Sequence, residues 1–174
     1  MKHTGINILL SGTLLLLGIV SGCTRNYDYP PEPVLKFKEF IYVENDSGDI
    51  EKGILVLEFT DGDGDIGLDQ GDTLPPYHHS GEYYYNFFID MYTKHDDKYL
   101  PVIFPDSTYT FNSRIPPIVF NGKSKAIKGE IEYTFDMLIM KPFLQSDTIR
   151  INTFIVDRAL HKSNVVITPD IPIL

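Results

Sequence analysis

The sequence holds a single cysteine, Cys23, so no disulfide bond can form within the chain. Basic residues are also scarce. Only 15 lysines and arginines stand against 24 aspartates and glutamates, which gives a formal net charge of -9. A surface with this excess of negative charge repels nucleic acids and anionic lipids, and it tends to collect cations. We therefore expect no nucleic-acid partner.

Motifs of catalysis are missing as well. The sequence contains neither a Gly-x-Ser-x-Gly nucleophile elbow nor a His-Glu-x-x-His zinc motif. Pairs of carboxylates can hydrolyse glycosides, but 24 acidic residues always allow some pair, so this feature discriminates little. We expect a protein that is not an enzyme, and a hydrolase is the least favoured of the functional classes considered.

The longest apolar run lies at the N-terminus, in the segment MKHTGINILLSGTLLLLGIVSGC. One lysine, an apolar stretch from Ile6 to Val20 and then small residues predict a secretory signal peptide over residues 1–22. The stretch is short and lacks the basic flank of a permanent membrane span. We therefore expect an exported protein.

The motif IVSGC, residues 19–23, resembles the lipobox of bacterial lipoproteins, although Ile19 stands where that family usually has leucine. The resemblance implies that Cys23 becomes the lipidated first residue of the mature chain, whose acyl chains would hold the domain at a membrane. Thr24 follows the cysteine in place of an aspartate, which by the same resemblance favours the outer membrane of the cell envelope over the inner one. An ordinary signal peptide with an incidental cysteine is the alternative.

A proline-rich tether, residues 23–33, comes next and shows no apolar periodicity. Loss of Lys2 with the signal peptide would leave 24 acidic against 14 basic residues and a net charge of -10. The remaining residues, 34–174, have the size of one domain that can bury a core of its own.

Within this domain, apolar and polar residues alternate and helical periodicity is almost absent. Glycine, proline, asparagine and aspartate separate the alternating segments. The predicted strands cover residues 34–44, 53–60, 83–93, 98–104, 107–120, 127–140, 148–157 and 163–169. Seven or eight such strands predict an all-β fold, an antiparallel β-sandwich, with a small closed barrel or a jelly roll as alternatives.

Two of these segments predict which side chains face the core. In residues 34–44 the inward face would be Leu35, Phe37, Ile41 and Val43. In residues 127–140 it would be Ile127, Ile131, Tyr133, Phe135, Met137 and Ile139. Both assignments assume that each strand keeps its period of two from end to end.

The segment DRALHKSNVVITP, residues 157–169, resembles the ending of bacterial immunoglobulin-like domains, which often read Asp-Arg-Ala-Gly-Asn-x-Ser between the last two strands. The matching residues are Asp157, Arg158, Ala159 and Ser163, while Leu160 and His161 replace the usual glycine and asparagine. With the lipobox and the segment FTDGDGDIG, the chain is similar to an uncharacterised family of single-domain bacterial surface lipoproteins. That resemblance implies an immunoglobulin-like β-sandwich and specifies no activity.

The segment EFTDGDGDIGLDQGD, residues 58–72, is the best candidate for a chemical site. Asp61, Asp63 and Asp65 alternate with glycines, and closely spaced carboxylates suit Ca²⁺, which takes six to eight oxygen ligands. Counted from Asp61, the spacing resembles an EF-hand loop with Asp69 ninth and Asp72 twelfth. It lacks the sixth-position glycine, the final glutamate and the preceding helix. A solvated Asp-Gly turn is the alternative.

Asp157 is expected to complete this site. In an immunoglobulin-like order, the connection after the second strand and the one before the last strand lie at the same end of the sandwich. Asp157 would then approach Asp61, Asp63 and Asp65. The sequence therefore predicts a structural calcium ion bound by these four aspartates.

Two other groups are weaker candidates. His78 and His79 could bind zinc or copper, but adjacent side chains rarely converge on one ion, so a solvated loop is the favoured interpretation. A glycan site would be favoured if two or more exposed tyrosines lay on one concave face of the domain. The tyrosines concerned are Tyr77, Tyr84, Tyr92, Tyr99 and Tyr109.

These observations leave two main functional hypotheses. The first is a lipid-anchored structural or adhesive module of the cell surface, attached to the membrane through Cys23. The second is an accessory lipoprotein of an outer-membrane uptake system that binds a glycan or a protein ligand. Immunoglobulin-like sandwiches serve both roles, so the fold does not choose between them.

Overall fold

The computed structural model describes residues 28–106, 109–118 and 126–173. The signal peptide over residues 1–22 and the lipidation site Cys23 are predictions that lie outside the described residues. Among the residues described, no helix is long and apolar enough to span a membrane.

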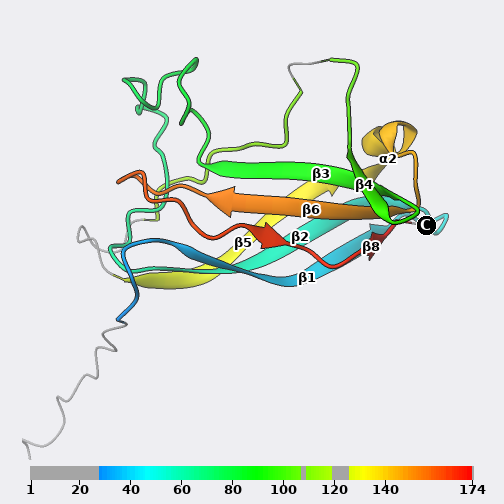
Figure 1. The fold of residues 1–174 in the computed structure, drawn as a ribbon, viewed down its shortest axis with the longest axis horizontal. Helices are drawn as coiled ribbons and strands as arrows, with labels where there is room; N and C mark the ends of the chain where they lie inside the picture. Colours follow the sequence, from blue (N-terminus) through cyan, green and yellow to red (C-terminus); the bar gives the residue numbers. More distant parts are fainter. Residues whose placement is uncertain (1–27, 107–108, 119–125, 174) are drawn as a thin grey trace, which may run out of the picture.

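Two antiparallel sheets pack against each other (Figure 1). One sheet has the order β1-β2-β5 and the other β4-β3-β6-β7, with β8 also paired to β6. The strands are β1 Val34–Glu44, β2 Ile50–Asp61, β3 Phe87–His95, β4 Lys98–Pro101, β5 Ile127–Asp136, β6 Thr148–Ile155, β7 Val166–Ile167 and β8 Ile171–Pro172. This order corresponds to strands A-B-E and C′-C-F-G of an immunoglobulin domain, which confirms the predicted sandwich.

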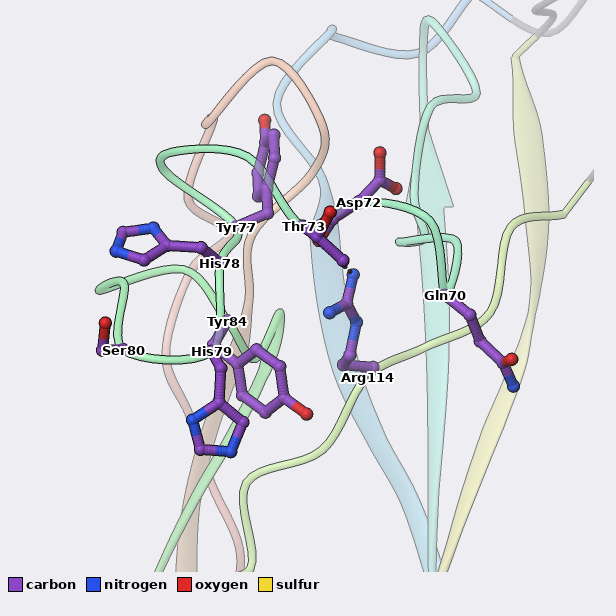
Figure 2. Close-up of a pocket in the computed structure, with 9 residues that line it drawn as sticks. All are labelled: Gln70, Asp72, Thr73, Tyr77, His78, His79, Ser80, Tyr84 and Arg114. Atoms are coloured by element: carbon purple, nitrogen blue, oxygen red, sulfur yellow. Dashed lines mark hydrogen bonds between the residues drawn. The ribbon is translucent and has the colours of Figure 1, made fainter.

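The connection between β2 and β3, residues 62–86, holds no strand and projects from one end of the sandwich (Figure 1). Backbone hydrogen bonds shape its turns, among them Gly81 N to His78 O at 2.7 Å. Figure 2 shows Thr73 and Tyr84 of this connection beside Arg114, which comes from the segment before β5, while His78 and Ser80 point away from it. The β6–β7 connection emerges at the same end of the sandwich (Figure 1).

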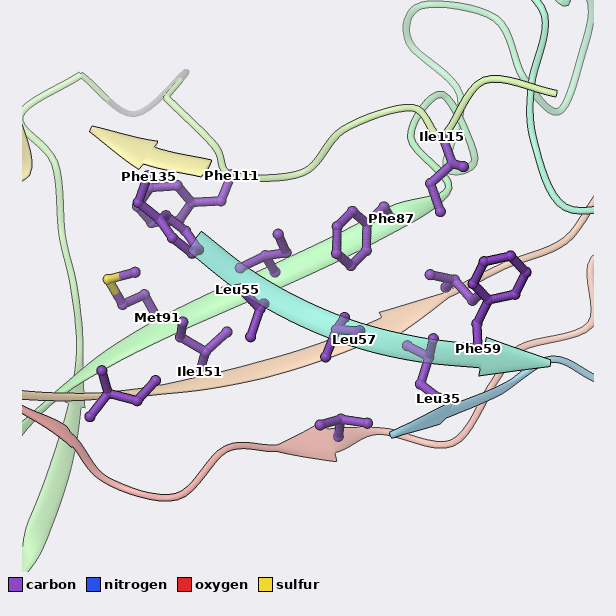
Figure 3. Close-up of a cluster of buried hydrophobic side chains, with 14 of the residues drawn as sticks. Leu35, Leu55, Leu57, Phe59, Phe87, Met91, Phe111, Ile115, Phe135 and Ile151 are labelled. Carbon is purple, nitrogen blue, oxygen red and sulfur yellow. The ribbon is translucent and has the colours of Figure 1, made fainter. Parts of the chain in front are cut away.

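The core lies between the sheets and is filled from both (Figure 3). On β2, Leu55, Leu57 and Phe59 alternate with outward-facing positions and expose at most 4% of their surface. Successive residues of a strand point to opposite faces, so every second residue enters the core. Asp61 is the next inward-facing position and is fully buried. The alternation that buries three hydrophobic side chains therefore also buries a carboxylate.

The predicted inward face of β1 is wrong in its second half. The register with β2 shifts between Phe37 and Glu39, where a bulge inserts one extra residue. Beyond the bulge Phe40 packs against the core, and Ile41 and Val43 are 39% and 36% exposed. One extra residue reverses which side chains face inward.

The strand predicted through residue 140 ends at Asp136, so the secondary structure predicted for its last four residues is wrong. Of the last two predicted inward positions, Met137 is confirmed as buried and Ile139 is wrong. The Asp136 side chain accepts a hydrogen bond from Ile139 N at 3.0 Å and caps the helix α2 (Met137–Met140), which a 3-10 turn, Lys141–Phe143, follows. An aspartate at this position favours a helix start over strand continuation. Met137 and Met140 are buried, whereas Ile139 is 60% exposed.

Other strand predictions were too long as well. The strands expected to end at residues 104 and 157 end at Pro101 and Ile155, and β7 covers only Val166–Ile167 of the expected residues 163–169. The strand expected from residue 83 begins only at Phe87, after Asn86 has bound a different segment. The buried Asn86 side chain accepts a hydrogen bond from Ile115 N at 2.7 Å. Residues 109–118, inside another predicted strand, contribute only an isolated bridge from Ser113 to Phe87. Prolines 116 and 117 follow that bridge and offer no backbone N–H for a ladder.

Candidate metal centre

Asp61 is the innermost carboxylate of the site. It ends β2 on the inward face and exposes 0% of its surface. Its Oδ2 accepts hydrogen bonds from the backbone N–H groups of Asp65 (3.0 Å) and Ile66 (3.2 Å), which wraps the following loop around the carboxylate. Its Oδ1 is buried and has no hydrogen-bond partner among the described residues. One oxygen therefore shapes the loop while the other is available to a ligand.

The glycines of the loop allow this close wrapping. A Cβ atom on Gly62 would lie 2.2 Å from the Tyr29 carbonyl oxygen, and Gly62 N donates to Pro30 O at 2.9 Å. Gly64 has a φ of 68°, in the left-handed region that glycine adopts readily. The segment that precedes β1 is thus held directly against the aspartate loop.

Asp63 and Asp65 face the same point as Asp61. The Oδ1 atom of each is buried and lacks a hydrogen-bond partner within the described part of the chain. The backbone N–H groups of Arg158 and Ala159 interact favourably with the Asp65 carboxylate. Asp65 therefore contacts the β6–β7 connection as well as its own loop.

Asp157 joins the site from the other sheet, two residues after β6, and is 1% exposed. One oxygen atom from each of Asp61, Asp63, Asp65 and Asp157 lies within 4.8 Å of the others. The four aspartates that the sequence singled out are therefore close together at one end of the sandwich. Ligand oxygens of one calcium ion are spaced in this way.

His161 is a neighbour that the sequence reasoning missed. Its backbone N donates to Asp157 Oδ1 at 2.7 Å, and its ring Nδ1 lies 2.9 Å from Asp157 Oδ2. His161 also forms a second group of potential ligands with Asp63 and Asp157. The only signal in the sequence was its place four residues after Asp157, where the resembling family usually has asparagine.

The electrostatics of the cluster favour a cation. Burial and then the neighbouring Asp63 raise the pKa of Asp61 to about 7, and burial and then Asp157 raise the pKa of Asp65 to about 6. Burial also raises the pKa of Asp157 despite the hydrogen bonds from His161, and the Asp157 carboxylate raises the pKa of His161. Buried carboxylates that crowd one another are costly in their charged form unless a cation or protons neutralise them.

Asp69 and Asp72, the ninth and twelfth positions of the EF-hand-like count, lie outside this cluster. Asp69 Oδ1 accepts from Gly71 N at 2.8 Å, and Asp72 Oδ2 accepts from Asp69 N at 2.7 Å. Asp72 Oδ1 forms an ion pair with Arg158. The likeness to an EF-hand therefore stops after the first three aspartates, because Asp69 and Asp72 bind groups of their own turn and Asp72 also binds Arg158.

The histidine pair and the tyrosines lie elsewhere. The two groups of potential metal ligands found among the described residues are both at the aspartate cluster, and neither includes His78 or His79. Tyr77 and Tyr84 line one cavity together with both histidines (Figure 2). Tyr99 instead hydrogen-bonds to Asp170, the residue before β8. Two of the five tyrosines thus share a concave face.

No protein-family model matches this chain, and neither the curated proteins nor the solved structures include a match to it.

Proposed function

We propose that this protein is a non-enzymatic module of a bacterial cell envelope, anchored by lipid at Cys23 and stabilised at one end by a calcium ion. The N-terminal motif and its lipobox-like ending support the anchor and the envelope location, with the outer membrane favoured by Thr24. The sandwich and its aspartate cluster support a structural or adhesive role at the surface.

The observation that carries the calcium assignment is the fully buried Asp61, whose Oδ1 has no partner among the described residues and lies beside three further carboxylates. Leaving a buried acceptor without a partner costs about 1–3 kcal/mol, more for a charged one. A cation that several oxygens share removes this cost and the mutual repulsion.

Calcium fits this donor set better than zinc or copper. The four side chains offer only oxygen atoms, which hard cations prefer, whereas zinc and copper favour histidine and cysteine. The nearby His161 ring nitrogen Nδ1 already pairs with Asp157. The irregular loop after β2 suits Ca²⁺, which tolerates flexible geometry, better than Mg²⁺, which demands a near-ideal octahedron.

Such an ion would join three parts of the fold. Asp61 ends β2 in one sheet, Asp157 follows β6 in the other, and Gly62 holds Pro30 next to the start of β1. The ion would therefore tie both sheets and the base of the tether together. A surface module that is pulled through its lipid anchor gains most from reinforcement at this point.

A calorimetric titration tests the assignment. The mature chain with Cys23→Ser, which removes the lipid, would be freed of metal and titrated with calcium chloride and, separately, with magnesium chloride. We expect one calcium site per chain and much weaker magnesium binding. The assignment would be refuted if calcium gave no heat of binding. It would also be refuted if an Asp63→Asn/Asp65→Asn variant gave the same heat of binding as the parent.

Ligand binding at the surface is the second candidate role. The cavity that Tyr77 and Tyr84 share is the observation that favours it (Figure 2). The two roles are compatible, because the cavity and the aspartate cluster use different side chains.

A further inference from the structure

A cavity of about 630 Å³ opens between the β2–β3 connection and Arg114 (Figure 2). Ligand sites in proteins usually measure roughly 300–1,000 Å³, so this volume suits a small organic ligand. The lining residues that matter here are Asp72, Tyr77, His78, Ser80, Tyr84 and Arg114.

One wall of the cavity is fixed to the sandwich by Arg158. Its guanidinium pairs with the Asp72 carboxylate through Nη2, and its Nη1 donates to Gly67 O at 3.3 Å. Its carbonyl oxygen accepts a hydrogen bond from the Tyr77 hydroxyl. The connection is therefore pinned at three points and the cavity is formed before any ligand arrives, which reduces the entropic cost of binding.

Arg114 supplies a positive charge, and it forms no ion pair with any residue that the structure describes. Its Nη2 donates to the carbonyl oxygens of Asp69 (2.8 Å) and Asp72 (3.3 Å), and its guanidinium carbon lies 5.2 Å from the centre of the Tyr84 ring. Its Nε is buried without a partner among the described residues. The carbonyl contacts fix its orientation and leave its charge available.

The acidic side chain in the wall does not cancel this charge, because Asp72 is already paired with Arg158. His78 adds a half-buried imidazole ring, and the exposed Ser80 adds a hydroxyl. The wall therefore combines a cation and hydrogen-bonding groups with the aromatic rings of Tyr77 and Tyr84.

We propose that this cavity binds an acidic saccharide, a sugar that carries a carboxylate. The carboxylate pairs with the Arg114 guanidinium, whose Nη1 takes part in neither carbonyl contact. The sugar hydroxyls exchange hydrogen bonds with His78 and Ser80, and the C–H face of the ring lies against an aromatic side chain. This inference deepens the binding role named above as the second candidate, and it does not depend on the identity of the metal.

The test compares two saccharides that differ mainly by one carboxylate-bearing sugar, 3′-sialyllactose and lactose, together with trigalacturonate as a second acidic probe. Calorimetry on the mature chain with Cys23→Ser, in buffer that contains calcium, measures each dissociation constant. We expect at least one acidic probe to bind, and lactose to bind at least about tenfold more weakly than sialyllactose if sialyllactose is that probe. Absence of binding by both acidic probes overturns the proposal, and so does equal affinity for lactose where sialyllactose binds.

Two variants and a control locate the site. Arg114→Gln should weaken binding of the acidic probe at least about tenfold. Ser80→Trp should abolish it by filling the cavity from an exposed position, and its melting temperature should be unchanged. Lys98→Gln removes the same charge at an exposed strand end outside the cavity and should have no effect.

Unchanged affinity in Ser80→Trp overturns the site even if Arg114→Gln fails to fold. A melting curve with and without calcium on the same samples keeps the two proposals separate. A calcium shift without saccharide binding refutes this inference alone, and saccharide binding without a calcium shift refutes only the metal assignment.

Discussion

The side chain of Asn164 satisfies both backbone groups of Leu35. Its Oδ1 accepts from Leu35 N at 2.8 Å, and its Nδ2 donates to Leu35 O at 3.0 Å. Leu35 lies on β1 of the first sheet, while Asn164 precedes β7 of the second. One amide thus closes the outer edge of β1 and links the two sheets beside the aspartate cluster.

Asn164→Ala should therefore destabilise the domain by about 1–2 kcal/mol, because two hydrogen bonds are lost and the edge of β1 is opened. Urea unfolding followed by fluorescence or circular dichroism measures this difference. Val165→Ala, at an exposed neighbouring position, is the matched control and should stay within about 0.5 kcal/mol of the parent. If the two variants were equally stable, the hydrogen bonds between Asn164 and Leu35 would contribute nothing to the free energy of unfolding.

Leu57→Ala should cost about 2–5 kcal/mol, since Leu57 is fully buried at the centre of β2 and its loss leaves a cavity between the sheets. Leu74→Ala removes the same atoms from a side chain that is 76% exposed and should change stability by no more than about 0.5 kcal/mol. The same unfolding measurement compares them. A small effect at Leu57 would contradict the packing in Figure 3.

Asp170 should make the domain sensitive to acid. Its carboxylate contacts Lys94 Nζ at 2.6 Å and Arg150 Nη2 at 2.7 Å, and hydrogen bonds from Lys94 and then Tyr99 hold the pKa of Asp170 well below its usual range. A lowered folded-state pKa stabilises the folded protein above the unfolded pKa of about 4. That contribution is lost as the pH falls below this value toward the folded pKa.

The difference in melting temperature between the parent and Asp170→Asn isolates this effect. We expect a clear difference near neutral pH that shrinks as the solution is acidified below about pH 4. Asp97→Asn, at an exposed position, is the control and should follow the parent at every pH. A difference between parent and Asp170→Asn that does not change with pH would contradict the role assigned to the ion pairs.

Cys23→Ala should release the protein from membranes or leave the precursor uncleaved, because lipid attachment in bacterial lipoproteins requires the cysteine thiol. Fractionation of cells that express the parent and the variant measures this. The control is Ser21→Ala, two residues before the cysteine, which keeps the small-residue motif. A variant of mature size that still sediments with membranes would refute the lipid anchor.

The fold could be predicted wherever alternation alone decides burial. Leu55, Leu57 and Phe59 all face the core between the two sheets, and the alternation continues to Asp61. The burial predicted from the alternation is therefore the burial observed. The pattern failed where one local interaction changed the path of the chain. The bulge after Phe37 and the cap at Asp136 are both events of a single residue, and a period of two carries no trace of them.

The candidate site likewise contains residues that the sequence predicted and residues that it missed. Asp61, Asp63 and Asp65 are close in sequence, and topology placed Asp157 at the same end of the sandwich. His161 was missed because its contact with Asp157 depends on the turn that follows β6. The cavity beside Arg114 was beyond prediction, since irregular turns build its walls and a distant arginine fixes them.

A calcium ion in the proposed site would be held by Asp61, Asp63, Asp65 and Asp157. An ion that binds only the folded state raises its stability by mass action. An ion present at about 100 times its dissociation constant adds about 2.7 kcal/mol, which corresponds to roughly 5–10 °C for a domain of this size.

The most direct test is a thermal melt of the mature chain with Cys23→Ser in millimolar calcium and in chelator, beside the same melts of Asp63→Asn/Asp65→Asn. We expect calcium to raise the melting temperature of the parent by roughly 5 °C or more and to leave the double variant unchanged. In chelator the double variant should melt above the parent, because it has lost the repulsion between carboxylates. A parent midpoint that is the same in calcium and in chelator, or an equal calcium shift in the double variant, would contradict the account.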